Sequence, residues 1–185
     1  MKIFYSAERS VWRAWLNEHF ASEPEVWFVF PMKEAGEAAM PYNDAVEEAL
    51  CFGWIDSTIK HIDALHRAQR FTPRKKGSAY SRPNIERLIR LEERGLLHPD
   101  VRKEVLSVIR EPFVFPEDIL DAVQAVPEAW ENVQNFPAGY LRIRIAYIDA
   151  ARKRPAEFQK RLGHFIAVSR EGKLIRGFGG IEKYY

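Results

Sequence analysis

The sequence has a single cysteine, Cys51, among its 185 residues. One thiol cannot form an internal disulfide or a thiolate metal cluster, so neither can stabilise this chain. Long apolar runs are also missing, and the longest, residues 26–32, is far short of the ~20 residues that cross a bilayer. The first residues hold no apolar segment of a secretory signal and reach an acid at Glu8. We therefore expect a cytoplasmic protein without a transmembrane segment.

An excess of charge of one sign is missing as well, since the net charge is +2, yet the charges are unevenly distributed. Residues 1–59 carry −6, residues 60–94 carry +6, residues 95–137 carry −5 and residues 138–185 carry +7. A composition that is 46% hydrophobic and 29% charged excludes disordered and fibrous proteins. Because the blocks alternate in sign, we expect them to neutralise one another rather than to follow a nucleic-acid backbone. Binding of nucleic acid or of an anionic surface through the two basic blocks is the alternative hypothesis.

Hydrophobic periodicity predicts an α+β fold for the first part of the chain. Ser6 is expected to N-cap a first helix that carries an aromatic stripe. Residues 25–30 are β-branched and aromatic, which predicts a buried strand, and a helix over residues 43–52 should follow. Two extended runs, residues 54–59 and 67–72, predict a β-hairpin and with it a small antiparallel sheet.

Beyond the hairpin the pattern predicts helices alone. Their expected ranges are 82–94, 100–109, 117–125, 128–135, 138–152 and 155–170. Pro112 and Pro116 mark a boundary between the helix expected over residues 100–109 and the helices that follow it. We therefore predict two domains, an α+β unit over residues 1–112 and a helical C-terminal portion over residues 113–185.

The predicted hairpin and the loop after it carry a concentrated group of polar and aromatic side chains. Strand pairing would bring Asp56 near the opposite strand, where Arg74 could pair with its carboxylate or with that of a ligand. An aromatic wall, an acid, an arginine and small polar groups suit a pocket for a small polar ligand or a peptide. The predicted ligand-binding residues are Trp54, Asp56, Thr72, Arg74, Ser81 and Asn84.

Two alternatives accompany this interpretation of the hairpin. Asp56 and Arg74 could form a purely structural pair that holds the loop in place. They could also serve an enzyme that acts on a small polar substrate, with Asp56 as general base and Arg74 as the anchor of an anion.

Two further groups of reactive residue types favour ordinary structural roles. His61, Asp63 and His66 form a three-ligand set that zinc or ferrous iron could use, but the segment resembles a solvated turn. Cys51 lies at the expected end of a helix, where the negative end of the dipole raises a thiol pKa. We therefore expect no metal, no cofactor and no catalytic residue among these four side chains.

Several strings occur in an order and spacing that resemble a known family. They are Trp12-Arg13-Ala14-Trp15-Leu16, Gly53-Trp54-Ile55-Asp56-Ser57, Phe71-Thr72-Pro73-Arg74, Tyr80-Ser81-Arg82-Pro83-Asn84 and Ala151-Arg152-Lys153-Arg154-Pro155. Together they resemble the YdeI/OmpD-associated family of bacterial proteins, also described as bacteriocin-protection proteins. Residues 8–95 carry most of the resemblance, which continues through the C-terminal helices.

The resemblance implies a role in protection against antimicrobial peptides and bacteriocins and an association with an outer-membrane porin. It implies no catalytic activity. Since no export signal is found, an indirect role in a stress response agrees better with the sequence than direct contact with an external bacteriocin. We therefore expect a non-enzymatic binding protein.

Overall fold

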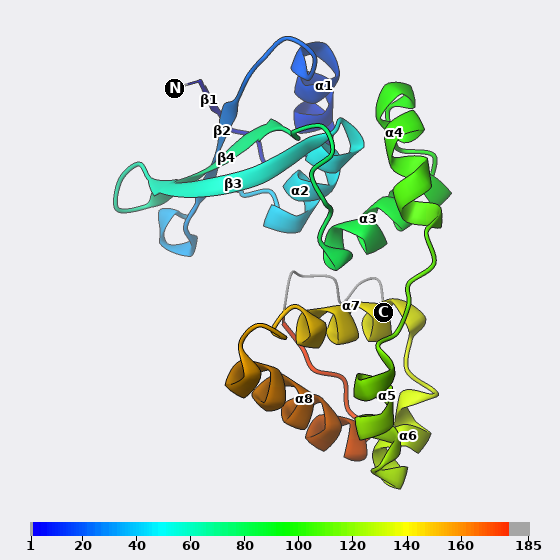
Figure 1. Cartoon of the computed structure of the whole chain (residues 1–185). Coiled ribbons are helices and arrows are strands. Elements are labelled where there is room, and N and C mark those ends of the chain that lie inside the picture. Colours follow the sequence, from blue (N-terminus) through cyan, green and yellow to red (C-terminus); the bar gives the residue numbers. More distant parts are fainter. Residues whose placement is uncertain (1, 178–185) are drawn as a thin grey trace. The chain divides into compact units, whose positions relative to one another are not determined.

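A computed structural model describes residues 2–177 of the chain and shows the predicted α+β fold (Figure 1). Its contacts divide the chain into two compact units. The first unit comprises Met1–Tyr80 and Leu88–Ile109, and the second comprises Ser81–Arg87 and Arg110–Tyr185. The predicted division into two domains at residue 112 stays a prediction.

A four-stranded mixed sheet forms the centre of the first unit, with the strand order β1-β2-β4-β3. The predicted hairpin is confirmed, because β3 and β4 pair antiparallel, and β4 in turn pairs antiparallel with β2. The strand β1 pairs parallel with β2 and was not predicted. The strands are β1 (Ile3–Phe4), β2 (Val26–Pro31), β3 (Trp54–His61) and β4 (His66–Pro73).

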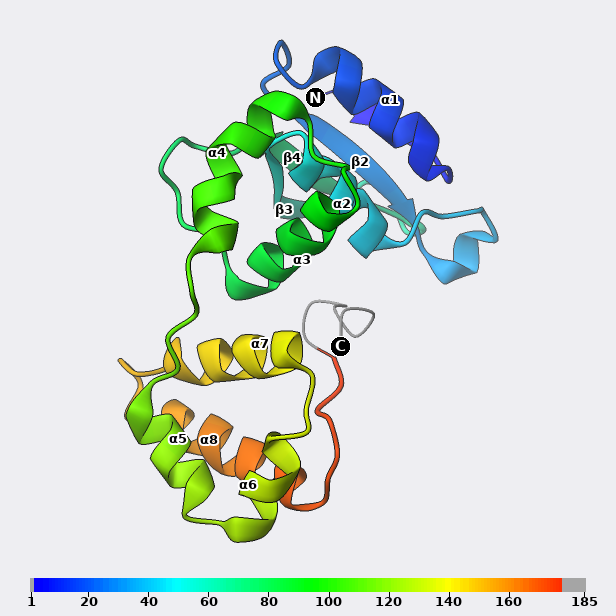
Figure 2. The ribbon, with the colours of Figure 1, turned by 90° about the vertical axis from the view of Figure 1, so that its right-hand side faces the viewer.

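Helices α1 (Arg9–His19) and α2 (Tyr42–Cys51) lie beside this sheet (Figure 2). Trp12 of α1 is fully buried against Phe28 and Phe71 of the sheet, and its Nε1 donates a hydrogen bond to the Ala45 carbonyl of α2. This aromatic packing explains the stripe in the first helix, since large buried rings supply much of the apolar area of a small core.

Of the helix boundaries predicted from the sequence, the end of α2 is confirmed and the start of α1 is wrong. Gly53 follows α2 with a φ of +71°, a left-handed conformation that glycine adopts at low cost, so the predicted helix stop is confirmed. The predicted Ser6 cap is wrong, because the residue before α1 is Glu8. Ser6 Oγ instead accepts a hydrogen bond from the Glu8 backbone N–H at 3.0 Å and closes a turn two residues earlier.

The helices after the hairpin follow the predicted order. They are α3 (Arg82–Glu93), α4 (Pro99–Arg110), α5 (Glu117–Gln124), α6 (Pro127–Val133), α7 (Ala138–Asp149) and α8 (Pro155–Arg170). In the second unit α5 to α8 enclose a core of their own around Ile119, Tyr140 and Phe165. No helix within residues 2–177 is both long and apolar enough to cross a membrane.

Candidate functional site

Asp56 and Arg74, the two charged residues of the predicted hairpin pocket, have different partners in the structure. Asp56 accepts a hydrogen bond from the Tyr42 hydroxyl, and its register partner on β4 is Phe71. Arg74 stacks its guanidinium 3.7 Å from the centroid of the Tyr80 ring and donates to the Ala79 carbonyl at 2.9 Å. No ion pair joins Asp56 to Arg74 in the described chain. Arg74 therefore holds its own loop in place.

The remaining predicted residues also have structural contacts. Trp54 is 1% exposed, and its Nε1 donates to the Phe20 carbonyl at 3.0 Å. Thr72 pairs with Ile55 across the ladder. Ser81 and Asn84 belong to the second unit, where the Asn84 side-chain oxygen accepts a hydrogen bond from Arg87 at 2.7 Å. The assignment of all six residues to one ligand site thus stays a prediction that no contact among them supports.

The histidine turn is held by carboxylates. His66 Nδ1 lies 2.9 Å from an oxygen of Asp63, and His66 Nε2 lies 2.9 Å from Glu37 Oε1. Both ring nitrogens can donate only in the imidazolium form, so the geometry selects the protonated ring. The hydrogen bond with Asp63, followed by that with Glu37, raises the pKa of His66. Among residues 2–177 no group of three or more His, Cys, Asp or Glu side chains is arranged to hold a metal ion.

We expect His66 to titrate above the ordinary histidine pKa of about 6.5. Since the pKa is raised in the folded state, the stabilisation is complete below the ordinary value and is lost as pH rises through the folded value. The substitution Glu37→Gln removes one carboxylate and should lower the pKa of His66. NMR titration of the imidazole C–H signals in both proteins measures this, and a His66 that titrates at or below 6.5 would contradict the two-carboxylate geometry.

The thiol of Cys51 is buried, as the sequence indicated. Burial, followed by the nearby Glu48 carboxylate, raises its pKa to about 11. A thiol in this state is a poor nucleophile, because the thiolate is the reactive form. Cys51 therefore acts as a small packing residue of the core.

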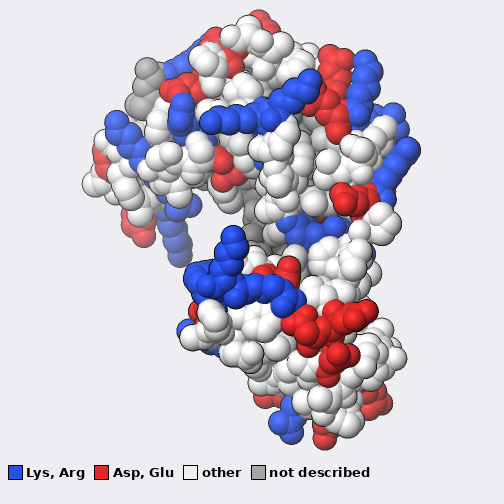
Figure 3. Space-filling view, viewed as in Figure 1, with Lys and Arg blue, Asp and Glu red and all other residues white. Residues whose placement is uncertain are grey.

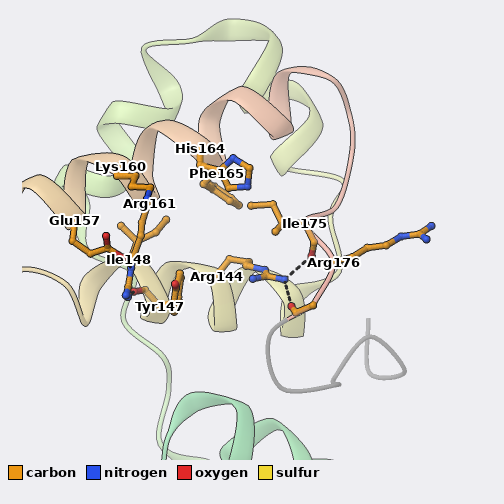
Figure 4. A pocket seen from close by; sticks show the side chains of 11 residues that line it. Arg144, Tyr147, Ile148, Glu157, Lys160, Arg161, His164, Phe165, Ile175 and Arg176 are labelled. Atoms are coloured by element: carbon orange, nitrogen blue, oxygen red, sulfur yellow. Dashed lines mark hydrogen bonds and ion pairs between the residues drawn. The ribbon is translucent and has the colours of Figure 1, made fainter. Parts of the chain in front are cut away.

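A cavity of about 360 Å³ lies in the second unit, between α7, α8 and residues 175–177 (Figure 4). Its apolar wall contains Ile148 of α7, Phe165 of α8 and Ile175. No local sequence pattern predicts this cavity, since its lining residues come from three separate segments. The residues that line it are Arg144, Tyr147, Ile148, Glu157, Lys160, Arg161, His164, Phe165, Ile175, Arg176 and Gly177.

Two arginines link the walls of this cavity. Arg161 of α8 reaches across to α7, where its guanidinium lies 3.7 Å from the centroid of the Tyr147 ring and donates to the Tyr147 carbonyl at 2.7 Å (Figure 4). Arg144 of α7 donates to the carbonyls of Ile175 and Gly177 and so fastens the segment after α8. These contacts hold two positive charges in fixed places.

One carboxylate, that of Glu157, also lines the cavity, and Arg161 Nε donates to it at 2.7 Å. This hydrogen bond lowers the pKa of Glu157. Lys160 and His164 lie one turn apart on α8, are exposed, and form no ion pair with any carboxylate of residues 2–177. The cavity therefore has a positive balance of charge and two basic groups that can contact a ligand.

Four of the ten Lys and Arg side chains that the structure describes in the block 138–185 form ion pairs, and one of these pairs, Arg152 with Asp118, joins blocks of opposite sign as the charge pattern predicted. Arg142 pairs with Glu86, Arg152 pairs with Asp118, and Lys173 pairs with Glu171. Lys and Arg side chains accordingly lie next to Asp and Glu over much of the visible face (Figure 3). Internal pairing therefore accounts for part of this basic block, whereas Lys160 of the cavity lining forms no ion pair with the carboxylates of residues 2–177.

Two known families match this chain, each over a different part of it. Residues 4–104 match the model of a family described as Domain of unknown function (DUF8412), which covers more than half of the chain, so the chain belongs to that family. Residues 112–172 match the family described as Bacteriocin-protection, YdeI or OmpD-Associated, and this confirms the predicted resemblance. The match lies in the helical second part, whereas the sequence motifs place most of the resemblance in residues 8–95. No curated protein and no solved structure matches the chain.

Proposed function

We propose that this chain, in which a DUF8412 domain precedes a segment of the bacteriocin-protection family, is a non-enzymatic binding protein for a small organic anion. The observation that carries the proposal is the cavity between α7 and α8, whose lining residues include four permanently charged cations and a single carboxylate. The lining residues from Arg144 to Phe165 all fall within the segment matched by that family.

The lining also limits the ligand class. The cavity volume of about 360 Å³ lies near the lower end of the range of small-molecule pockets, about 300–1,000 Å³. Ile148, Phe165 and Ile175 line the cavity with apolar side chains that a simple inorganic ion would not use. A ligand with one anionic group and an apolar body satisfies both walls, because burial of the body adds about 25 cal/mol per Å². A basic peptide, in contrast, would meet charge of its own sign.

A protective role follows from this proposal without catalysis. A protein that captures an organic anion can change the free concentration of that molecule in the cell. No step of this role requires contact with an external bacteriocin, which agrees with the indirect role expected from the sequence.

The fluorescent anion 8-anilinonaphthalene-1-sulfonate tests the proposal, since it combines a sulfonate with an apolar body. We expect saturable binding to the native protein, and binding about tenfold weaker after Lys160→Glu, because a carboxylate then faces the sulfonate. The matched control is Lys153→Glu, which changes the net charge equally at an exposed residue between α7 and α8 that does not line the cavity. Its affinity should stay within about twofold of the wild type.

Equal weakening by the two substitutions would mean that the probe senses net charge alone and would contradict the proposed site. The absence of saturable binding to the wild type would contradict it as well. Thermal unfolding of each variant, followed by circular dichroism, shows whether the fold is retained.

A further inference from the structure

We propose that the first unit holds a second ligand site, independent of the first, which binds an N-acyl amino acid, the chemical equivalent of the carboxyl end of a peptide. The site is a cavity of about 260 Å³ lined by Phe30, Tyr42, Ile59, Arg67 and Gln69. It lies on the predicted hairpin, but of the six residues expected to form the hairpin pocket none lines it.

Gln69 is the observation that points to a ligand. Its side chain is only 4% exposed, and its amide forms no hydrogen bond with any group in residues 2–177. Its amide atoms are not sealed from solvent, so they are accessible from the cavity and available to a ligand. Gln69 lies at the middle of β4, between Phe28 of β2 and Ile59 of β3, and lines the cavity. An amide held in this way can pair with the donor and acceptor of a ligand amide.

Arg67 supplies a charge beside this amide. It precedes Gln69 by two residues on the same strand, so the two side chains lie on the same face of the sheet. Arg67 is exposed and forms no ion pair with the carboxylates that the structure describes. A guanidinium of this kind binds a carboxylate through two parallel hydrogen bonds.

An apolar surface completes the cavity. The rings of Phe30 and Tyr42 lie edge to face with centroids 6.0 Å apart, and Ile59 is 57% exposed at the rim. The hydrogen bond from the Tyr42 hydroxyl to Asp56 fixes the position of the Tyr42 ring. Amide, carboxylate and apolar side chain are the three parts of an N-acyl amino acid, and they match Gln69, Arg67 and the two rings in turn. The small volume limits the ligand to about this size.

Calorimetric and ¹⁵N NMR titrations with N-acetylglycine, N-acetyl-L-leucine and N-acetyl-L-phenylalanine test the site. We expect at least one of them to bind and to shift the amide signals of Ile59, Arg67 and Gln69. N-Acetyl-L-leucinamide, which lacks the carboxylate, should bind at least tenfold more weakly than N-acetyl-L-leucine. Arg67→Met and Gln69→Met should each weaken binding at least tenfold. Arg94→Met, an exposed arginine away from the cavity, and Lys160→Glu of the first site are the controls and should leave it unchanged.

Gln69→Met also separates a ligand site from a structural role. Since the amide has no partner within the chain, its removal should leave the melting temperature unchanged or raised while binding is lost. Loss of thermal stability would show that the amide supports the fold and would overturn the proposal. So would binding by none of the three acids, equal binding of the acid and its amide, or signal shifts confined to α7 and α8. A failure of the anion probe at the first site leaves this result unaffected, because the two sites share no residue.

Discussion

Replacing Glu86 by alanine is expected to lower the free energy of unfolding by about 4 kcal/mol. Glu86 is 5% exposed, and both its carboxylate oxygens accept hydrogen bonds from Arg142 at 2.7 Å. Arg82 Nε donates to the same carboxylate at 2.7 Å, and its side chain is 11% exposed. Removal of Glu86 would leave the guanidinium groups of Arg82, 11% exposed, and Arg142, 26% exposed, without their shared counter-ion, and this costs more than the loss of an exposed pair.

Urea denaturation followed by circular dichroism measures the change. Glu93→Ala on the same helix is the matched control, because Glu93 is half exposed and pairs with Arg90 at the surface at 3.1 Å. Exposed pairs of this kind contribute about 0–1 kcal/mol. Equal effects of the two substitutions would show that the charges around Glu86 are solvated.

Replacing Glu48 by alanine should lower the free energy of unfolding by about 3 kcal/mol. Glu48 is 3% exposed and pairs with Arg9 and, at 2.7 Å, with Arg13. The side chains of Arg9 and Arg13 keep 31% and 35% of their exposure, so water solvates them in part and the expected loss is smaller than at Glu86. Arg9 also keeps its contact with Glu47 at 3.0 Å.

The double variant Arg13→Met/Glu48→Met tests whether the two side chains stabilise the fold through a direct interaction. It removes both charges together, so it should be more stable than the sum of the two single variants predicts. Tryptophan fluorescence follows this unfolding well, because four of the five tryptophans, Trp12, Trp15, Trp27 and Trp54, lie in the first unit. Additive effects would contradict a direct interaction between the two side chains.

Local patterns predicted most of the secondary structure correctly. The hairpin β3–β4 shows in the sequence as two extended runs with a turn between them, and Pro155 and Gly53 mark the start and the end of helices. The strand β1 was missed for a physical reason, since two residues are too few to show a period and pair only with a strand more than twenty positions away. Ser6 was misplaced because a serine side chain closes a turn as readily as it caps a helix.

The candidate sites depend on contacts that no local pattern contains. Arg13 and Glu48 are 35 positions apart, and Glu86 and Arg142 are 56 positions apart. Spacing along the hairpin placed Asp56 and Arg74 close together, but the short reach from Arg74 to Tyr80 and the carbonyls of its own loop determines where the guanidinium lies. The cavity between α7 and α8 forms only when the two helices pack. The sequence therefore shows the basic residues of this region but not the cavity that they line.

The central claim, that the cavity between α7 and α8 binds an amphipathic anion, is tested most directly by ¹⁵N NMR titration of the wild-type protein with hexanoate. Hexanoate should shift the amide signals of Ile148, Lys160, His164 and Phe165 with one common saturation curve, whereas hexanol, which lacks the charge, and acetate, which lacks the apolar body, should shift them far less. Shifts of equal size with all three compounds, or shifts absent from α7 and α8, would contradict the account.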